Sequence, residues 1–102
     1  MIHKIAINGF GRIGRAFFRL AEGVPELEVV AINDLADIEN LAYLLKHDTA
    51  YGAADFSVSV RQVDEWRKVL VVNGRDVPVF CEKTPSDLPW GEGGIDVVLE
   101  AT

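Results

Sequence analysis

The sequence predicts an α/β fold built on a doubly wound parallel sheet, truncated at its C-terminal end and carrying an antiparallel hairpin insertion. Three observations predict it: short apolar runs alternate with helical periodicity, glycines follow the first run, and a segment of strand-like alternation follows the second helical stretch. With 102 residues, 49% hydrophobic and 25% charged, the chain amounts to one small globular domain at most.

The first third of the chain predicts a strand, a helix and a second strand. Residues 4–8 form a short apolar run ended by glycines, which favours a buried parallel strand. Residues 27–32 form a similar run. Between them, an apolar stripe at helical spacing predicts an amphipathic helix that starts at Arg12 and stops at Gly23. The stripe consists of Ile13, Ala16, Phe17 and Leu20, with Arg15, Arg19 and Glu22 on the polar side.

The rest of the chain predicts a second helix, a hairpin and two further core strands. Asp37 can cap a helix that ends before Thr49, and its apolar stripe is Ile38, Leu41, Leu44 and Leu45. Residues 56–60 and 68–72 alternate apolar and polar side chains, and residues 72–75 suit a hairpin turn. The third and fourth core strands are expected at residues 77–80 and 95–100.

A glycine motif connects the first strand to the first helix. Residues Gly9, Phe10, Gly11, Arg12, Ile13 and Gly14 match the pattern G-x-G-x-x-G. One glycine permits the tight turn, one lets a pyrophosphate approach the backbone, and one allows close packing of helix and strand. The free amides and the helix dipole would bind the pyrophosphate despite the acidic net charge. The sequence therefore predicts a Rossmann-type dinucleotide site; the alternative is a glycine turn that binds no ligand.

Asn33 and Asp34 end the second predicted strand, and Asp34 lies 20 positions beyond Gly14. A carboxylate at this place accepts hydrogen bonds from the adenosine ribose and repels the 2′-phosphate of NADP. NAD is therefore the expected cofactor. The alternative is that Asp34 only stabilises the turn after Asn33.

Composition excludes several classes of function. A net charge of −6 without a basic tract argues against nucleic-acid binding. The sequence contains no run of 18 apolar residues, which a membrane-spanning helix would need, and no signal-peptide pattern. The single cysteine, Cys81, cannot form an internal disulfide, and no spacing suggests a metal site. We expect a cytoplasmic protein in which Cys81 is a buried packing residue rather than a nucleophile. His3, His47, Trp66 and Trp90 are expected to be structural or solvated.

Five segments resemble, in order, the N-terminal part of phosphorylating glyceraldehyde-3-phosphate dehydrogenases. They are residues 7–15, 30–35, 44–49, 88–91 and 97–102, so the resemblance spans essentially the whole chain. It implies that Arg12 and Ile13 bind the pyrophosphate through backbone amides, that Asp34 holds the adenosine ribose, and that Thr102 lies near the cofactor. Lys83 stands where the family often has an arginine beside adenine, so a planar guanidinium is replaced by a point charge.

The resemblance also implies the identity of a parent enzyme. That enzyme would be a homotetramer of glycolysis that oxidises and phosphorylates glyceraldehyde 3-phosphate with NAD, using a catalytic cysteine and histidine. Neither of those residues is expected in this chain, so residues 1–102 would be the N-terminal part of the dinucleotide-binding domain, without the catalytic domain and inactive alone. An unpaired edge at residues 95–101 would favour self-association. The alternatives are the front segment of an erythrose-4-phosphate dehydrogenase and a free-standing nucleotide-binding or interaction module.

Overall fold

The computed structural model describes residues 1–47, 57–65, 67–84, 88 and 94–102. The elements are β1 (His3–Asn8), α1 (Arg12–Glu22), β2 (Leu27–Asn33), α2 (Ile38–His47), β3 (Val58–Gln62), β4 (Lys68–Val72), β5 (Arg75–Phe80) and β6 (Val97–Glu100). These strands form one six-stranded sheet in the order β3-β4-β5-β2-β1-β6. The predicted α/β fold is therefore confirmed.

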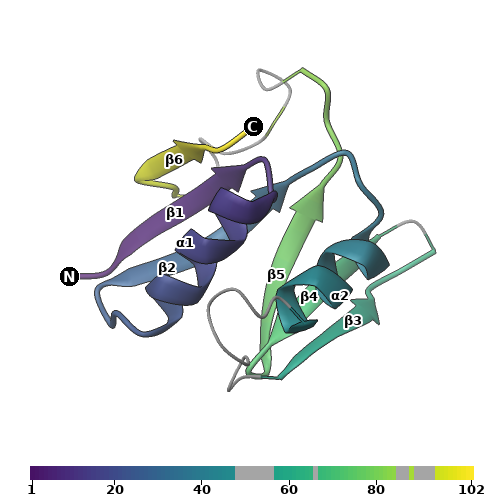
Figure 1. Cartoon of the computed structure of the whole chain (residues 1–102), viewed down its shortest axis with the longest axis horizontal. Coiled ribbons are helices and arrows are strands. Elements are labelled where there is room, and N and C mark those ends of the chain that lie inside the picture. The colour runs from purple at the N-terminus through teal and green to yellow at the C-terminus, as the bar shows by residue number, and fades with distance from the viewer. Residues whose placement is uncertain (48–56, 66, 85–87, 89–93) are drawn as a thin grey trace.

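The parallel part of the sheet extends from β1 in both directions. β1 pairs in parallel with β2 on one side and with β6 on the other, and β2 pairs in parallel with β5. Figure 1 shows the arrowheads of β6, β1, β2 and β5 at the same edge of the sheet, with the C-terminus beside the end of β1. The strand order reverses between β1 and β6, and sheets of this class bind ligands at the carboxyl ends of the strands beside such a reversal.

The predicted antiparallel insertion is present, and it shares a strand with the parallel sheet. β4 pairs antiparallel with β3 and with β5, while the end of β5 pairs in parallel with β2 through Ile32–Val79 and Asn33–Phe80. The turn between β4 and β5 contains Asn73 and Gly74, with φ angles of 53° and 80°. Two positive φ values are typical of the type I′ turn, whose twist matches that of a hairpin.

Strand boundaries differ from the predicted ones by at most two residues. β3 starts at Val58 rather than at residue 56, which lies outside the described residues. β5 starts at Arg75 rather than at residue 77, because the residues after the turn pair with β4 before the strand reaches β2. β6 starts at Val97 rather than at residue 95.

Helix α1 packs with a face other than the predicted one. Gly14, Phe18 and Ala21 are buried, whereas Ile13 and Leu20 are 71% and 64% exposed. Gly14 explains why α1 is rotated about its axis relative to the predicted orientation. A Cβ at this position would lie 2.4 Å from the carbonyl oxygen of Gly9. Only glycine permits this approach of helix and strand. The buried spacing i, i+4, i+7 is helical, but glycine has no apolar side chain to reveal it in the sequence.

The predicted polar side of α1 is partly buried and joins the helix to its surroundings. The Arg15 guanidinium donates to the Phe10 carbonyl at 3.1 Å, and the Arg19 guanidinium donates to the Leu45 carbonyl. Glu22 accepts a hydrogen bond from Arg75 at 2.5 Å. These long side chains contact neighbouring elements instead of pointing only into water.

Helix α2 largely follows the prediction. Leu41 and Leu45 are buried, Ile38 packs against the core, and the Asp37 carbonyl accepts the hydrogen bond of the Leu41 amide at the start of the helix. In Figure 1 both helices lie in front of the sheet, α1 over β1 and β2 and α2 over the hairpin strands. The core between this face and the helices consists of Ile7, Phe10, Phe18, Ala21, Val29, Ile32, Leu41, Leu45, Val58, Leu70, Val72 and Val77.

Candidate functional site

A cleft of about 490 Å³ lies at the carboxyl ends of the parallel strands. It is lined by Asn8, Gly9, Gly11, Asn33, Asp34, Leu35, Glu82, Lys83, Glu100, Ala101 and Thr102. These residues follow or end four different strands, which are separated in the chain but adjacent in the sheet. The cleft therefore lies where the strand order reverses, as the doubly wound topology predicts.

The three motif glycines have three different environments. Gly9 has a φ of +97°, and a Cβ there would lie 2.7 Å from the Thr102 nitrogen. Gly14 is needed for the close contact of α1 with the loop, as described above. A Cβ on Gly11, in contrast, would meet no atom within 4 Å. The fold itself requires glycine at positions 9 and 14, whereas at position 11 the space beside the backbone is open.

The amides of the glycine loop divide into two groups. The N–H of Gly9 donates to the Asn33 carbonyl at 2.8 Å, and the N–H of Phe10 donates to the Asp34 carboxylate at 2.7 Å. The first hydrogen bond within α1 runs from Arg15 to Gly11, at 2.9 Å. The amides of Arg12 and Ile13 precede it and have no partner within the helix.

The N-terminus of α1, which is the positive end of the helix dipole, is not capped by a side chain. No side chain caps the helix at Gly11, and its first turn contains no acidic residue. Uncapped amides together with the helix dipole form a site that favours an anion. An anion at this place would lie directly beside the open backbone of Gly11.

Phe10 anchors the loop instead of facing the cleft. Its side chain is 1% exposed and meets the Phe18 ring edge-to-face, with ring centroids 5.8 Å apart. Its amide donates to Asp34, and its carbonyl accepts from Arg15. The sequence motif alone does not reveal this role, because the middle position of G-x-G is not specified by the pattern.

Asp34 joins the end of β2 to the glycine loop. One carboxylate oxygen accepts from the Phe10 amide, and the other accepts from the Ala36 amide at 2.8 Å. Each carboxylate oxygen has two lone pairs, so each can accept one further hydrogen bond. Because Asp34 lines the cleft, these remaining acceptor positions can serve a ligand.

Asn33 lines the cleft, but its side-chain amide is engaged within the protein. Its Nδ2 donates to Asn8 Oδ1 at 2.9 Å and to the Glu82 carbonyl at 3.0 Å. Its Oδ1 accepts from the Glu82 amide at 2.9 Å. Asn33 is only 4% exposed, so its side chain contributes to the shape of the cleft rather than to its surface.

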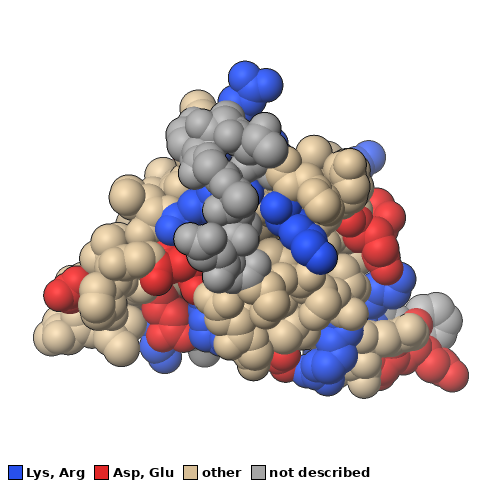
Figure 2. Space-filling view, turned by 60° about the horizontal axis from the view of Figure 1, so that its bottom comes forward, with Lys and Arg blue, Asp and Glu red and all other residues tan. Residues whose placement is uncertain are grey.

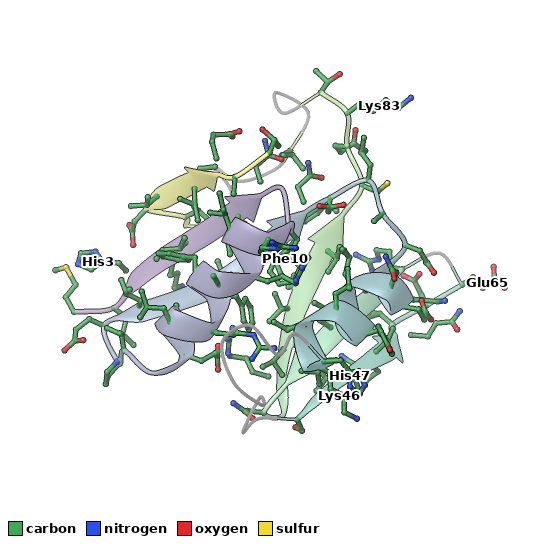
Figure 3. All side chains as sticks on the ribbon, in the orientation of Figure 1. His3, Phe10, Lys46, His47, Glu65 and Lys83 are labelled. Atoms are coloured by element: carbon green, nitrogen blue, oxygen red, sulfur yellow. The ribbon has the colours of Figure 1, made fainter. Side chains whose placement is uncertain are left out.

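Lys83 and Thr102 both line the cleft, and they follow the two outermost strands of the parallel part of the sheet, β5 and β6. Lys83 belongs to the segment after β5, and Figure 3 shows its side chain directed away from the sheet. Thr102 follows β6, and its backbone passes close to Gly9. The structure thus brings the predicted residues of the loop, of β2, of the segment after β5 and of the chain end around one cavity.

Five lining residues were not predicted from the sequence: Asn8, Leu35, Glu82, Glu100 and Ala101. Asn8 and Glu100 end parallel strands, Leu35 and Ala101 directly follow a lining residue, and Glu82 lies two residues beyond the end of β5. The topological rule for the carboxyl ends of strands could have identified Asn8 and Glu100, once the strand order was assumed. Glu82 could not be identified in this way, because it lies beyond the end of β5 and its place depends on its hydrogen bonds with Asn33.

Among the other sequence candidates, the three that the structure describes, Cys81, His3 and His47, do not line the cleft. Cys81 is exposed, which corrects the prediction that it is buried. The reason is that β5 ends at Phe80, so Cys81 lies beyond the sheet, with its thiol directed to the Leu35 carbonyl at 3.8 Å. Figure 3 shows His3 near the N-terminus and His47 at the end of α2, both away from Lys83. Trp66 and Trp90 lie outside the described residues.

Three further observations concern the charged surface, metal binding and membrane insertion. On the face shown in Figure 2, Lys and Arg side chains alternate with acidic and uncharged residues. The part of the chain that the structure describes contains no group of three His, Cys, Asp or Glu residues able to hold a metal ion. Neither described helix is long and apolar enough to cross a membrane.

Known proteins resemble this chain over its whole length. Residues 3–102 match the family model described as glyceraldehyde 3-phosphate dehydrogenase, NAD binding domain. The glyceraldehyde-3-phosphate dehydrogenase of Geobacillus stearothermophilus is 50% identical over 102 residues, which are 100% of this chain and 29% of that protein. That of Clostridium pasteurianum is 54% identical over 99 residues, or 97% of this chain and 28% of that protein.

A third relative gives the same result. The glyceraldehyde-3-phosphate dehydrogenase of Haemophilus influenzae is 48% identical over 102 residues, again covering 100% of this chain and 29% of that protein. The chain thus spans less than a third of the length of these relatives. Because the family model matches residues 3–102, nearly the whole chain, the chain belongs to the family of NAD-binding domains of glyceraldehyde 3-phosphate dehydrogenase.

Proposed function

We propose that the cleft holds NAD with its pyrophosphate at the N-terminus of α1, its adenosine ribose on Asp34 and its adenine toward Lys83. The observation that carries this proposal is that some amides of the glycine loop donate within the protein, whereas others have no partner within the helix. Gly9 and Phe10 donate within the protein, while the backbone beside Gly11 is open and the amides of Arg12 and Ile13 precede the first helical hydrogen bond. This arrangement supports binding of a phosphate group by backbone donors.

The order of the strand ends supports the orientation of the ligand. The glycine loop follows β1, Asp34 follows β2, and Lys83 lies on the segment that follows β5, which is next to β2 in the sheet. A ligand with pyrophosphate on the loop and ribose on Asp34 would therefore place its base toward β5. The nicotinamide end would point toward β6 and Thr102.

Asp34 is proposed to select NAD over NADP. Its two free acceptor positions suit the two ribose hydroxyls, whereas a 2′-phosphate would bring a second negative charge beside this carboxylate. Two such charges a few ångströms apart repel by about 1 kcal/mol even at the dielectric constant of water. Glu82 lines the same cleft, which adds a further carboxylate near that phosphate.

We also propose that the parent protein is a glycolytic glyceraldehyde-3-phosphate dehydrogenase of the cytoplasm, active as a homotetramer. The three relatives named above all carry this enzyme name, which favours it over an erythrose-4-phosphate dehydrogenase. Residues 1–102 would form the front part of its dinucleotide-binding domain and would be inactive alone. A free-standing nucleotide-binding module remains the alternative, and the sequence of the gene beyond residue 102 would decide between them.

Self-association of the chain is proposed to use the outer edge of β6. β6 pairs with β1 on one side, and Val97 and Val98 are 52% and 40% exposed. Main-chain groups on the free side of an edge strand can pair with another strand. A second copy of the chain would provide such a strand.

Isothermal titration tests the cofactor proposal. The chain is expected to bind ADP-ribose, ADP and NAD with similar affinities, because the contacts named above involve only the adenosine and pyrophosphate groups. NADP is expected to bind more weakly, and Gly11→Val should abolish binding of all of them by filling the open space at the loop. Equal affinities for NADP and NAD would show that the role given to Asp34 is wrong.

A further inference from the structure

A chain of side-chain hydrogen bonds crosses the carboxyl ends of the parallel strands. It starts at the Glu100 carboxylate on β6, whose two oxygens each lie 3.0 Å from Asn8 Nδ2 on β1. Asn8 Oδ1 accepts from Asn33 Nδ2 on β2 at 2.9 Å. Asn33 then holds the Glu82 peptide unit after β5 through its N–H and its carbonyl. We call these four residues the strand-end relay.

The relay has a fixed direction. A carboxylate only accepts hydrogen bonds, so the Asn8 amide must present its nitrogen to Glu100 and its oxygen to Asn33. Asn33 must then present its nitrogen to Asn8, which leaves its oxygen for the Glu82 N–H. The negative charge at one end of the relay thereby determines the orientation of both amides and the placement of Glu82 at the other end.

The wall of the cleft that contains Glu82 and Lys83 depends on this relay. The parallel pairing between β2 and β5 comprises only Ile32–Val79 and Asn33–Phe80. Beyond it, the Asp34 amide donates to the Phe80 carbonyl at 3.0 Å, and the two hydrogen bonds of Asn33 hold the Glu82 backbone. Asn33 and Asn8 are 4% and 5% exposed, so water cannot readily replace these bonds.

We propose that Asn8 and Asn33 are positioning residues for nucleotide binding, which hold the segment after β5 at the distance from the glycine loop that the adenosine group requires. This inference rests on the proposed function of the cleft. It assigns to Asn33 an indirect role, since its side chain is engaged with Asn8 and Glu82 rather than with the ligand. Loss of the relay should therefore affect the adenosine contacts and spare the pyrophosphate contacts at the loop.

The first test reverses the direction of the relay. In Asn33→Asp, the new carboxylate can accept from Glu82 but cannot donate to Asn8, so the affinity for ADP-ribose should fall about tenfold. Adding Glu100→Gln moves the carboxylate from one end of the relay to the other. Asn8 can then turn over and donate to Asp at position 33, so the double variant should bind ADP-ribose more tightly than the single variant. Asn40→Asp, on the exposed side of α2, makes the same replacement outside the relay and should leave the affinity unchanged.

Binding of inorganic pyrophosphate to the glycine loop distinguishes loss of the relay from a general loss of structure, because only a general loss of structure would abolish it. Its effect on the NMR amide signals of Gly11 and Arg12 should be the same in the original chain and in Asn33→Asp. If Asn33→Asp does not fold, Asn33→Ser replaces it, because a hydroxyl on Cβ is too short to connect Asn8 with Glu82, and the same loss is expected. An unchanged affinity for ADP-ribose in the folded variant, or no gain in the double variant, would overturn the proposal.

Hydrogen exchange of the Glu82 amide tests the relay without a ligand. This amide should be protected in the original chain and in Asn33→Asp, whose carboxylate can still accept from it, and exposed in Asn33→Ser, whose hydroxyl is too short to reach it. If the original chain fails to bind ADP-ribose, the proposed function of the cleft is wrong, and the exchange pattern alone decides whether the relay holds this wall. Equal exchange in all three proteins would overturn the relay itself.

Discussion

The Asp34 carboxylate accepts a hydrogen bond of 2.7 Å from the backbone amide of Phe10, so the residue proposed to hold the ribose also holds the glycine loop. The side chain of Phe10 is buried against Phe18, which fixes the other side of the same loop. The ribose site and the pyrophosphate site are therefore connected through one hydrogen bond. A change at Asp34 is expected to affect both.

Asp34→Ala should weaken binding of ADP-ribose by about 1–3 kcal/mol, the range for hydrogen bonds to a charged group. It should also reduce the preference for NAD over NADP, because the repulsion of the 2′-phosphate is removed. Isothermal titration measures both effects. Glu26→Ala is the control, since it removes an exposed carboxylate from the turn before β2, at the opposite end of that strand. If both variants behave alike, the effect of Asp34 is only one of net charge.

The motif glycines should separate stability from binding. Gly14→Ala forces a Cβ against the Gly9 carbonyl, and such overpacking costs about 1–3 kcal/mol of unfolding free energy. Gly11→Ala places a Cβ in open space at a φ of −81°, so its unfolding free energy should stay within about 1 kcal/mol of the original. Urea denaturation gives both values. A large loss of stability in Gly11→Ala would contradict the view that position 11 is kept open for a ligand.

Arg75 should contribute to stability without contributing to nucleotide binding. Its guanidinium donates to the Val29 carbonyl at 2.6 Å and to Glu22 at 2.5 Å, and its side chain is 30% exposed. Arg75→Met should cost about 1–3 kcal/mol, because partly buried acceptors lose a charged donor. Arg61→Met breaks an exposed ion pair with Asp76 and should cost less than about 1 kcal/mol. Urea denaturation measures the loss of unfolding free energy in both variants. Equal losses would contradict the view that the partly buried hydrogen bonds of Arg75 stabilise the fold more than an exposed ion pair does.

The chain alone should not produce NADH from glyceraldehyde 3-phosphate, NAD and phosphate. Its one cysteine is exposed beyond β5, where its thiol contacts the Leu35 carbonyl. Absorbance at the NADH band measures turnover, with the intact enzyme of a relative as the positive control. Turnover that Cys81→Ser abolishes would overturn this prediction.

Replacing Val97 on β6 by lysine should shift the chain toward the monomer, because a charge on an edge strand opposes pairing with another strand. Val63→Lys, in the exposed hairpin connection, adds the same charge elsewhere and should leave the oligomeric state unchanged. Multi-angle light scattering at high micromolar concentration compares the proteins. A monomeric original chain would refute self-association through this edge.

Local patterns in the sequence predicted the elements and their order. The apolar run before Gly9, the glycine motif and the acidic residue after the second strand are signals whose physical causes act over a few residues. The same is true of the turn at Asn73 and Gly74, where positive φ values favour these residue types. For this reason the α/β fold, the hairpin and the glycine loop could all be inferred before any contact was known.

The rotation of α1 could not be predicted in the same way. Its apolar residues suggested that Ile13 and Leu20 face the sheet, yet both are exposed. The rotation follows from the contact of Gly14 with the Gly9 carbonyl, which is a matter of available space rather than of hydrophobicity. The burial of Cys81 was mispredicted although the strand end at Phe80 was predicted correctly, because only the tertiary structure shows whether other elements cover the residue that follows a strand.

The sequence by itself determined that a glycine loop, a free helix start and a carboxylate follow the first two strands, since each of these depends on residue type and short spacing. Only the tertiary structure decided which side chains share hydrogen bonds across the strand ends. Asn8, Asn33 and Glu100 come from separate strands, and their contacts exist only because β6, β1 and β2 lie side by side in one register. Hydrogen bonds between buried side chains require distances near 3 Å and a consistent donor direction, and the packed sheet alone provides both.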